Sequence, residues 1–191
     1  KLKVKNTNKL KQLRSLFNDY YLKAYREYFS HGTGGGLMEP FVKSGNLPVK
    51  NFKEGEFFNV KNIDPQYFSK YIKFRMESCY GCPLCCKKTV EFNDYWNVES
   101  KYGGPEYETL GSFGSNCGID DFKVICKANE LCNKFSLDTI SAGVTISFAM
   151  ECFENGLITI EDTKGIKLKF GNGKALIEII KKIANREDFG D

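Results

Sequence analysis

The sequence predicts a mainly α-helical, multihelical domain with irregular loops and at most one or two short β-hairpins. Apolar residues recur at three- and four-residue steps through several long segments, which is the pattern of amphipathic helices. Between these segments stand stretches rich in glycine and proline, which end helices and form loops. Since no internal repeat or low-complexity tract interrupts this organisation, we expect residues 1–191 to form a single helical domain.

The first helix is expected near the N-terminus, where apolar and charged residues alternate at helical spacing from Leu10 to Tyr28 over about five turns. We expect it to end at Ser30-His31-Gly32, because the three glycines at 34–36 require a loop. His31 would then lie at a helix C-terminus, where a cation interacts favourably with the helix dipole. We expect that role for it rather than metal binding.

The next part of the chain is expected to be less regular. Residues 37–62 contain prolines and glycines without a sustained period, which predicts an extended, loop-rich segment. Asp64-Pro65 is typical of a helix start, because aspartate caps free backbone N–H groups and proline fits the first turn. We expect this helix to reach about Phe74. The polar, aromatic stretch at 89–118 is expected to contain a short strand or two.

The C-terminal part carries the most regular helical patterns. Apolar residues at helical steps predict one helix over 119–135. Asp138 is expected to cap the next helix, which ends at Asn155-Gly156 and should be central because it is apolar almost all round. Residues 157–171 predict either a β-hairpin or irregular turns. A last helix is expected over about 173–185.

Composition and charge argue against several functional classes. Hydrophobic residues at 41% and charged residues at 27% are typical of a soluble globular protein. The net charge is only +4 and the lysines are scattered among acids, so we expect no nucleic-acid binding. No apolar run approaches the ~20 residues of a membrane span. The eight cysteines are too few and too clustered for a disulfide scaffold, so we expect a reducing, cytoplasmic location.

The most distinctive segment has four cysteines within eight positions: Cys79, Cys82, Cys85 and Cys86. Thiolates this dense are rarely explained by packing, and they are the usual ligands of iron–sulfur clusters and of zinc. The spacing Cys79-x2-Cys82-x3-Cys86 places three sulfurs on one tight loop. Adjacent Cys85 and Cys86 can pair only in a strained geometry, so we expect no disulfide between them.

A cubane cluster needs a fourth thiolate, and the chain offers Cys117, Cys126, Cys132 and Cys152 as candidates. Cys132 and Cys152 fall on apolar helix faces and are expected to be small buried hydrophobes. Cys117 lies in a Gly/Ser-rich loop and is the only flexible candidate, so the fourth ligand is either Cys117 or a group outside this chain. Zinc competes for the same thiolates. No second Cys-x2-Cys pair follows, so the spacing favours an iron–sulfur cluster.

Further motifs appear along the chain in a definite order. Residues 45–52 read GNLPVKNF, residues 104–109 read GPEYET, residues 131–143 read LCNKFSLDTISAG and residues 183–187 read IANRE. With the cysteine segment, these motifs resemble those of the tungsten-dependent aldehyde:ferredoxin oxidoreductase family, in the same order. The likeness covers essentially the whole chain, which makes it far more specific than the cysteine spacing alone.

The resemblance implies an enzyme that oxidises an aldehyde to a carboxylic acid at a tungsten, or related molybdenum, ion held by two pterin dithiolenes. Electrons would leave one at a time through a 4Fe–4S cluster to ferredoxin. Family members have a β-rich pterin-binding first domain and two largely helical domains, of which this chain corresponds to the middle one. Cys79, Cys82 and Cys86 match three cluster ligands. The fourth family cysteine lies in the third domain, and Cys85 is then a neighbour.

The resemblance also implies roles for polar residues. Glu108 matches a glutamate near the metal, where a carboxylate can move the proton released as water or hydroxide adds to the carbonyl carbon. Asn133, Leu137 and Asp138 belong to a segment that matches the family's pterin-contact element, where a helix N-terminus offers N–H groups to the cofactor. Two departures occur there, because Asn133 replaces an aspartate and Ser136 replaces a glycine. Asp138 is also expected to cap the following helix.

The implied assembly is larger than this chain. The first and third domains of the family are missing, so we expect the chain alone to be catalytically incompetent and to have no complete cofactor site. Some relatives bridge a homodimer with a metal held by a glutamate and a histidine. With His31 as the only histidine, we expect no such bridge in any homodimer of the full enzyme.

Alternatives to this interpretation remain open from the residues alone. One is a small cytoplasmic zinc-binding module with Cys117 as the fourth ligand, and another is a helical fragment that binds nothing. Lys87 and Lys88 stand beside the cysteine loop. They are expected to stabilise a reduced cluster, to steer an acidic ferredoxin, or simply to be a solvated pair.

Overall fold

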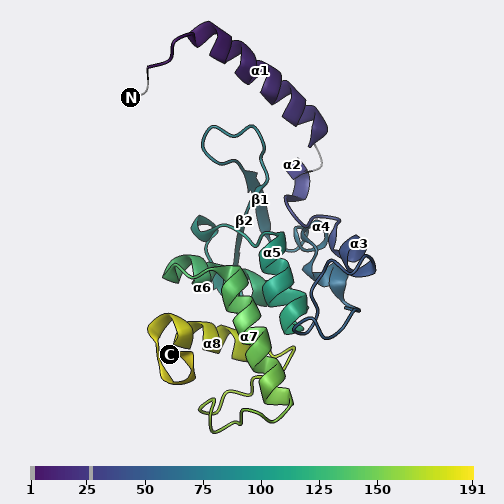
Figure 1. The fold of residues 1–191 in the computed structure, drawn as a ribbon, viewed down its shortest axis with the longest axis vertical. Coiled ribbons are helices and arrows are strands. Elements are labelled where there is room, and N and C mark those ends of the chain that lie inside the picture. The colour runs from purple at the N-terminus through teal and green to yellow at the C-terminus, as the bar shows by residue number, and fades with distance from the viewer. Residues whose placement is uncertain (1–2, 26–27) are drawn as a thin grey trace.

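Helices make up most of the regular structure, and the described residues form one small antiparallel sheet (Figure 1). The computed structural model describes residues 3–25 and 28–191. Its helices are α1 (Thr7–Ala24), α2 (Tyr28–His31), α3 (Met38–Lys43), α4 (Pro65–Phe68), α5 (Tyr107–Thr109), α6 (Phe122–Phe135), α7 (Thr139–Glu154) and α8 (Gly173–Asn185), and its strands are β1 (Lys73–Glu77), β2 (Lys87–Asn93) and β3 (Asn97–Val98). The mainly α-helical class is confirmed. Among these residues, no helix is both long and apolar enough to cross a membrane.

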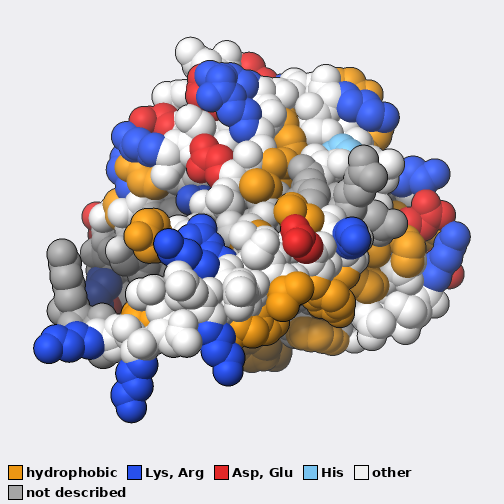
Figure 2. All heavy atoms as spheres, turned by 90° about the horizontal axis from the view of Figure 1, so that it is seen from above, with side chains coloured by type: hydrophobic (Ala, Val, Ile, Leu, Met, Phe, Trp, Pro, Cys, Tyr) orange, Lys and Arg blue, Asp and Glu red, His pale blue; other side chains and the backbone are white. Residues whose placement is uncertain are grey.

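The first predicted helix is confirmed as α1, which stands away from the body of the molecule (Figure 1). Asn6 caps it by accepting a hydrogen bond from the Lys9 N–H at 2.9 Å. None of its residues is buried, so its apolar face is not covered by the described residues. Seen from above, basic side chains are scattered over this end of the molecule with hydrophobic ones between them (Figure 2). The predicted helix end at His31 falls in the separate helix α2, and residues 26–27 lie outside the described residues.

The helix predicted from Asp64 to Phe74 is wrong beyond its first turn. Asp64 does cap α4 by accepting a backbone N–H, but the helix ends at Phe68. In Lys73–Glu77, side chains alternate between exposed and half-buried positions, as a strand with one covered face requires. The letters KFRME carry this two-residue period, which indicates a strand rather than a helix.

The sheet has the strand order β1-β2-β3 and carries the cysteines on its longer hairpin. Pairing between β1 and β2 ends at Glu77 and Lys87, so residues 78–86 form the connecting loop. β2 is the middle strand, and its residues 88–90 are buried against the body. The short strands expected within 89–118 are therefore present as β2 and β3.

Residues 107–117 form a continuous helical path, which the sequence does not predict. α5 leads into a wide π-helical turn at Leu110–Gly114 and then a 3-10 turn at Ser115–Cys117. Leu110 and Phe113 are fully buried in the core. Glycine and serine are poor helix formers, so tertiary packing rather than local propensity holds this segment in place.

The helices α6, α7 and α8 begin and end close to their predicted positions. Asp121, Asp138 and Asn172 each cap one of them through a side-chain oxygen. The prediction that α7 is central holds for one face of the helix and is wrong for the other. Ile146 lies in the core, whereas Phe148 is 60% exposed.

Two segments predicted as irregular differ in outcome. Residues 157–171 contain no strand, so the predicted hairpin is wrong and the predicted turns are confirmed, with Ile166 and Leu168 anchoring them in the core. Residues 37–62 are mainly loop, but they include α3 and part of a 3-10 turn at Val60–Ile63.

We expect the substitution Gly143→Ala to destabilise the domain by about 1–3 kcal/mol, because overpacking a close helix contact has this cost. An added Cβ would lie 2.7 Å from the Cβ and 2.8 Å from the carbonyl carbon of Ser112, so α7 would have to move away from the π-helical turn. Urea unfolding measures the effect. Gly55→Ala is the control, because its added methyl meets nothing within 4 Å. Equal stabilities of the two variants would contradict this packing.

Candidate functional site

The cysteine loop, residues 79–86, is the turn of the β1–β2 hairpin and projects from the body (Figure 1). The Cys82 N–H donates to the Cys79 carbonyl at 3.0 Å. Gly81 between them has φ +73°, a left-handed conformation that favours glycine. Cys79 and Cys82 are exposed and Cys86 is half-buried, and all are free thiols. The loop therefore presents its sulfurs to solvent, where a ligand can reach them.

The cysteine loop fits an iron–sulfur cluster by the chemistry of its donors and by their access. The described residues contain no group of three or more Cys, His, Asp or Glu side chains already placed to hold a metal ion. Partial burial, then the Glu106 carboxylate and the neighbouring Cys82 thiol, raise the pKa of Cys86. Bound cations act in the opposite sense, because the thiolate is the form that coordinates metal. Because no such group is already placed in the described residues, the loop would need a change in sulfur positions and a fourth ligand to bind a cluster.

Cys117, Cys126 and Cys132 do not supply that ligand, because all three are buried in the core. Cys117 is fully buried, and its thiol donates to the carbonyls of Ser112 and Gly143 at 3.3 and 3.5 Å. The prediction of a flexible Cys117 is wrong because its segment is a helical turn inside the core. Cys132 is buried as predicted, and burial raises its pKa to about 12. Cys152 is only half-buried and lines a groove beside α7, so its predicted burial is wrong.

A polar cleft of about 440 Å³ lies where β2 begins, next to the cysteine loop. β2, the segment before α5, and the facing ends of α6 and α7 form its walls. Two predicted site residues, Glu108 and Asn133, line this cleft together with Lys88 and Glu106. Glu108 is exposed, and its carboxylate has no hydrogen bond or ion pair within the described part of the chain. It is therefore free to meet a ligand that enters the cleft.

Asn133 holds the cleft wall together. Its side-chain amide donates to the carbonyl of Tyr102 at 3.2 Å and to that of Asn129 at 3.0 Å, which ties α6 to the loop before α5. An aspartate, which has no N–H to donate, cannot make these two bonds. The asparagine at this position thus has a structural role of its own.

Ser136 ends α6 in the left-handed conformation, with φ 59° and ψ 38°. Glycine is the preferred residue at such a helix end because other residues meet a steric penalty there. The backbone conformation alone therefore explains why glycine suits this position. This departure does not by itself remove a ligand contact.

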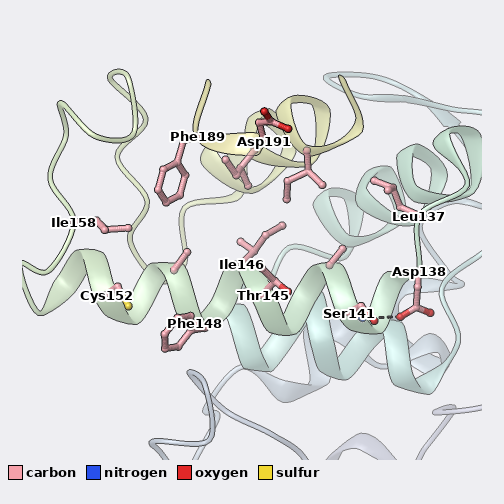
Figure 3. A pocket seen from close by; sticks show the side chains of 15 residues that line it. Leu137, Asp138, Ser141, Thr145, Ile146, Phe148, Cys152, Ile158, Phe189 and Asp191 are labelled. Atoms are coloured by element: carbon pink, nitrogen blue, oxygen red, sulfur yellow. Dashed lines mark hydrogen bonds between the residues drawn. The ribbon is translucent and has the colours of Figure 1, made fainter. Parts of the chain in front are cut away.

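Asp138 and Leu137 line a separate, apolar groove of about 530 Å³ between α7 and α8 (Figure 3). Asp138 caps α7 by accepting the Ser141 N–H at 2.7 Å, and this hydrogen bond lowers the pKa of Asp138. The walls are mainly apolar, with Ile146 and Phe189 across from each other. The predicted pterin-contact residues are therefore divided between two cavities that meet at the N-terminus of α7.

The basic pair beside the cysteine loop is also divided. Lys87 is exposed, but Lys88 is fully buried, so the interpretation of a solvated pair is wrong for Lys88. Burial lowers the pKa of Lys88, and the ion pair with Glu106 at 3.0 Å opposes that shift. The burial of Lys88 cannot be predicted from the sequence, because two adjacent lysines usually indicate exposed side chains.

Comparison with known proteins connects this geometry to one family. Residues 10–191 match the family described as aldehyde ferredoxin oxidoreductase, domains 2 & 3. The chain is 37% identical over 157 residues to the tungsten-containing aldehyde ferredoxin oxidoreductase of Pyrococcus furiosus, which covers 81% of this chain and 25% of the relative. The protein of the same description from Thermococcus kodakarensis is 35% identical over 156 residues, with the same two shares.

A more distant relative is the aliphatic sulfonate oxidoreductase, WOR-like subunit, of Pyrococcus furiosus. It is 28% identical over 182 residues, which is 93% of this chain and 28% of the relative. The chain thus spans about a quarter of the length of the relatives it matches.

We expect Ser136→Gly to stabilise the domain by about 0.5–1 kcal/mol, because glycine adopts the left-handed conformation without a steric penalty. Urea unfolding of the chain measures the gain. Ser141→Gly is the contrasting variant, since residue 141 is in the first turn of α7 and glycine there should destabilise. A loss of stability in Ser136→Gly would contradict the conformational explanation.

Proposed function

The chain belongs to the aldehyde ferredoxin oxidoreductase family, and from this we propose that it is the middle, helical domain of an enzyme that oxidises aldehydes to carboxylic acids. Electrons would pass through a 4Fe–4S cluster to ferredoxin. The first, pterin-binding domain and the third domain of the family would complete the enzyme, so the chain alone should be inactive. One observation supports this proposal most strongly. The three matching thiols lie on an accessible hairpin loop, and the residues that follow this loop, Lys87 and Lys88, line the cleft that holds Glu108.

The cysteine loop would hold the cluster through Cys79, Cys82 and Cys86. Each must lose its proton to bind iron, and the exposed position of the loop lets solvent take up those protons. Gly81 lets the backbone turn between the first two ligands because glycine adopts its φ of +73° without strain, although an added Cβ would meet nothing within 4 Å. Cys85 would remain a free thiol beside the cluster.

Glu108 would act on the substrate side of the chain. Oxidation of an aldehyde to an acid adds one water oxygen and releases two electrons and two protons, and the tungsten (or molybdenum) bis-pterin centre supplies this two-electron chemistry when it is bound. Glu108 would accept a proton from the water as its oxygen adds to the carbonyl carbon. Its exposed carboxylate at the cleft is suited to that role.

The pterin side of the site would use the junction between α6 and α7. Asp138 and Leu137 line the apolar groove directly before Thr139, which lines the polar cleft, and Asn133 fixes the end of α6. The competing zinc-module interpretation required Cys117 as a fourth ligand. That thiol is buried and hydrogen-bonded in the core, so this interpretation loses its support.

We expect Cys82→Ser to abolish the cluster in the full-length protein that carries this chain. After anaerobic purification, the unmodified protein should contain about four iron and four acid-labile sulfide per protein molecule. The variant should contain much less of both. Cys85→Ser is the matched control, because it removes a neighbouring thiol of the same loop. Retention of iron in Cys82→Ser, or zinc in place of iron in the unmodified protein, would contradict the proposed cluster.

We expect Glu108→Gln to lower kcat for aldehyde oxidation by about 10²-fold or more, because the amide cannot accept the proton. The iron and sulfide contents should stay unchanged. Glu99→Gln is the control, since Glu99 is an exposed carboxylate whose ion pair among the described residues is with a surface lysine, Lys101. Steady-state kinetics with the full-length enzyme decides the matter. An unchanged kcat in Glu108→Gln would rule out the proposed base.

A further inference from the structure

Lys88 is a charged side chain that is completely buried beside the cysteine loop. It follows Cys86 by two residues at the start of β2, and its side chain is 0% exposed. A buried ammonium group is costly unless it is paired and hydrogen-bonded. The contacts of the Lys88 ammonium group therefore have to compensate for the cost of its burial.

Three contacts satisfy the ammonium group. Nζ donates to the carbonyl of Thr33 at 2.9 Å, to the Thr33 hydroxyl at 3.2 Å and to the Glu106 carboxylate at 3.0 Å. Thr33 also donates its hydroxyl proton to Glu106 and accepts the Tyr107 N–H at 3.0 Å. Lysine, threonine and glutamate thus form one closed polar network.

The backbone is closely packed around Lys88. A Cβ added to Gly32 would lie 2.9 Å from Nζ, and one added to Gly104 would lie 3.1 Å from the Cβ of Lys88. Both glycines let the main chain approach the lysine where a side chain would intrude. The network therefore joins the glycine-rich loop, β2 and the segment before α5 into one unit.

This unit links the two parts of the proposed site. Lys88 is two residues from Cys86, and Glu106 is two residues from Glu108. Both members of the ion pair line the polar cleft. The hydrogen bonds of Lys88 therefore join the strand that follows the cysteine loop to the segment that carries Glu108.

We propose that Lys88 is a positioning residue for electron transfer, whose charge, balanced by Glu106, sets the electrostatic potential at the cysteine loop and fixes that loop relative to Glu108. This inference depends on the proposed function. A cluster becomes more negative when it is reduced, so a nearby cation favours the reduced form and a nearby anion disfavours it. Because the lysine is desolvated, its effect is less screened than that of a surface charge.

The test is a redox titration of the cluster in the full-length enzyme, followed by its electron paramagnetic resonance signal. Lys88→Met leaves Glu106 unbalanced and should make the midpoint potential more negative. Glu106→Gln leaves Lys88 unbalanced and should make it more positive. The double variant should return close to the unmodified value, and Lys87→Met, a change of an exposed neighbour, should shift it least.

Shifts of opposite sign are the signature, because a merely structural defect would not produce them. If Lys88→Met does not fold, Glu106→Gln and the double variant still decide, since Glu106 is 37% exposed and the Lys88 ammonium keeps its two hydrogen bonds to Thr33 when the carboxylate is replaced. Unchanged midpoint potentials, or shifts of one sign in both single variants, would overturn the inference. Absence of any cluster in the unmodified enzyme would instead overturn the proposed function.

Discussion

A buried ammonium group must have its hydrogen-bond donors satisfied, and in this molecule that requirement brings distant parts of the chain together. Lys88 enters the interior from β2 and meets Thr33 from the glycine-rich loop and Glu106 from the segment before α5. Thr33 also holds the first N–H of α5, at Tyr107. The hairpin, the glycine-rich loop and the start of α5 therefore cannot move independently. The position of the end of the cysteine loop beside the polar cleft depends on this arrangement.

Much of the helical fold can be predicted because its signals are local. Asp138 and Asn172 cap helices whose apolar residues recur at regular steps, and both helices lie where the sequence places them. β1 is missed because the cap at Asp64 is a strong helix signal, whereas strand pairing depends on residues that are remote in sequence. The helical path through Leu110–Gly114 is missed because burial, rather than glycine and serine propensity, holds it.

The candidate site likewise has features that local sequence patterns predict and features that depend on tertiary contacts. The spacing of Cys79, Cys82 and Cys86 is a local pattern, and the resemblance to a family adds Glu108 to it. That Glu108 and Asn133 share one cleft is a tertiary fact that no local pattern contains. Cys117 shows the converse, because its Gly/Ser-rich surroundings predict a loop while the core encloses it. Burial of Lys88 is likewise set by partners about twenty and fifty residues away.

The first turn of α7 is a partition between two cavities. Thr139 faces the polar cleft, while Asp138 and Ser141 border the apolar groove. The hydroxyls of Thr109 and Thr139 lie 2.8 Å apart, and Gly143 rests against Ser112 one turn later, so the partition is braced from the side of α5. Close-packed interiors yield little and transmit strain. A molecule that enters one cavity and displaces the first turn of α7 would therefore also change the volume of the other cavity.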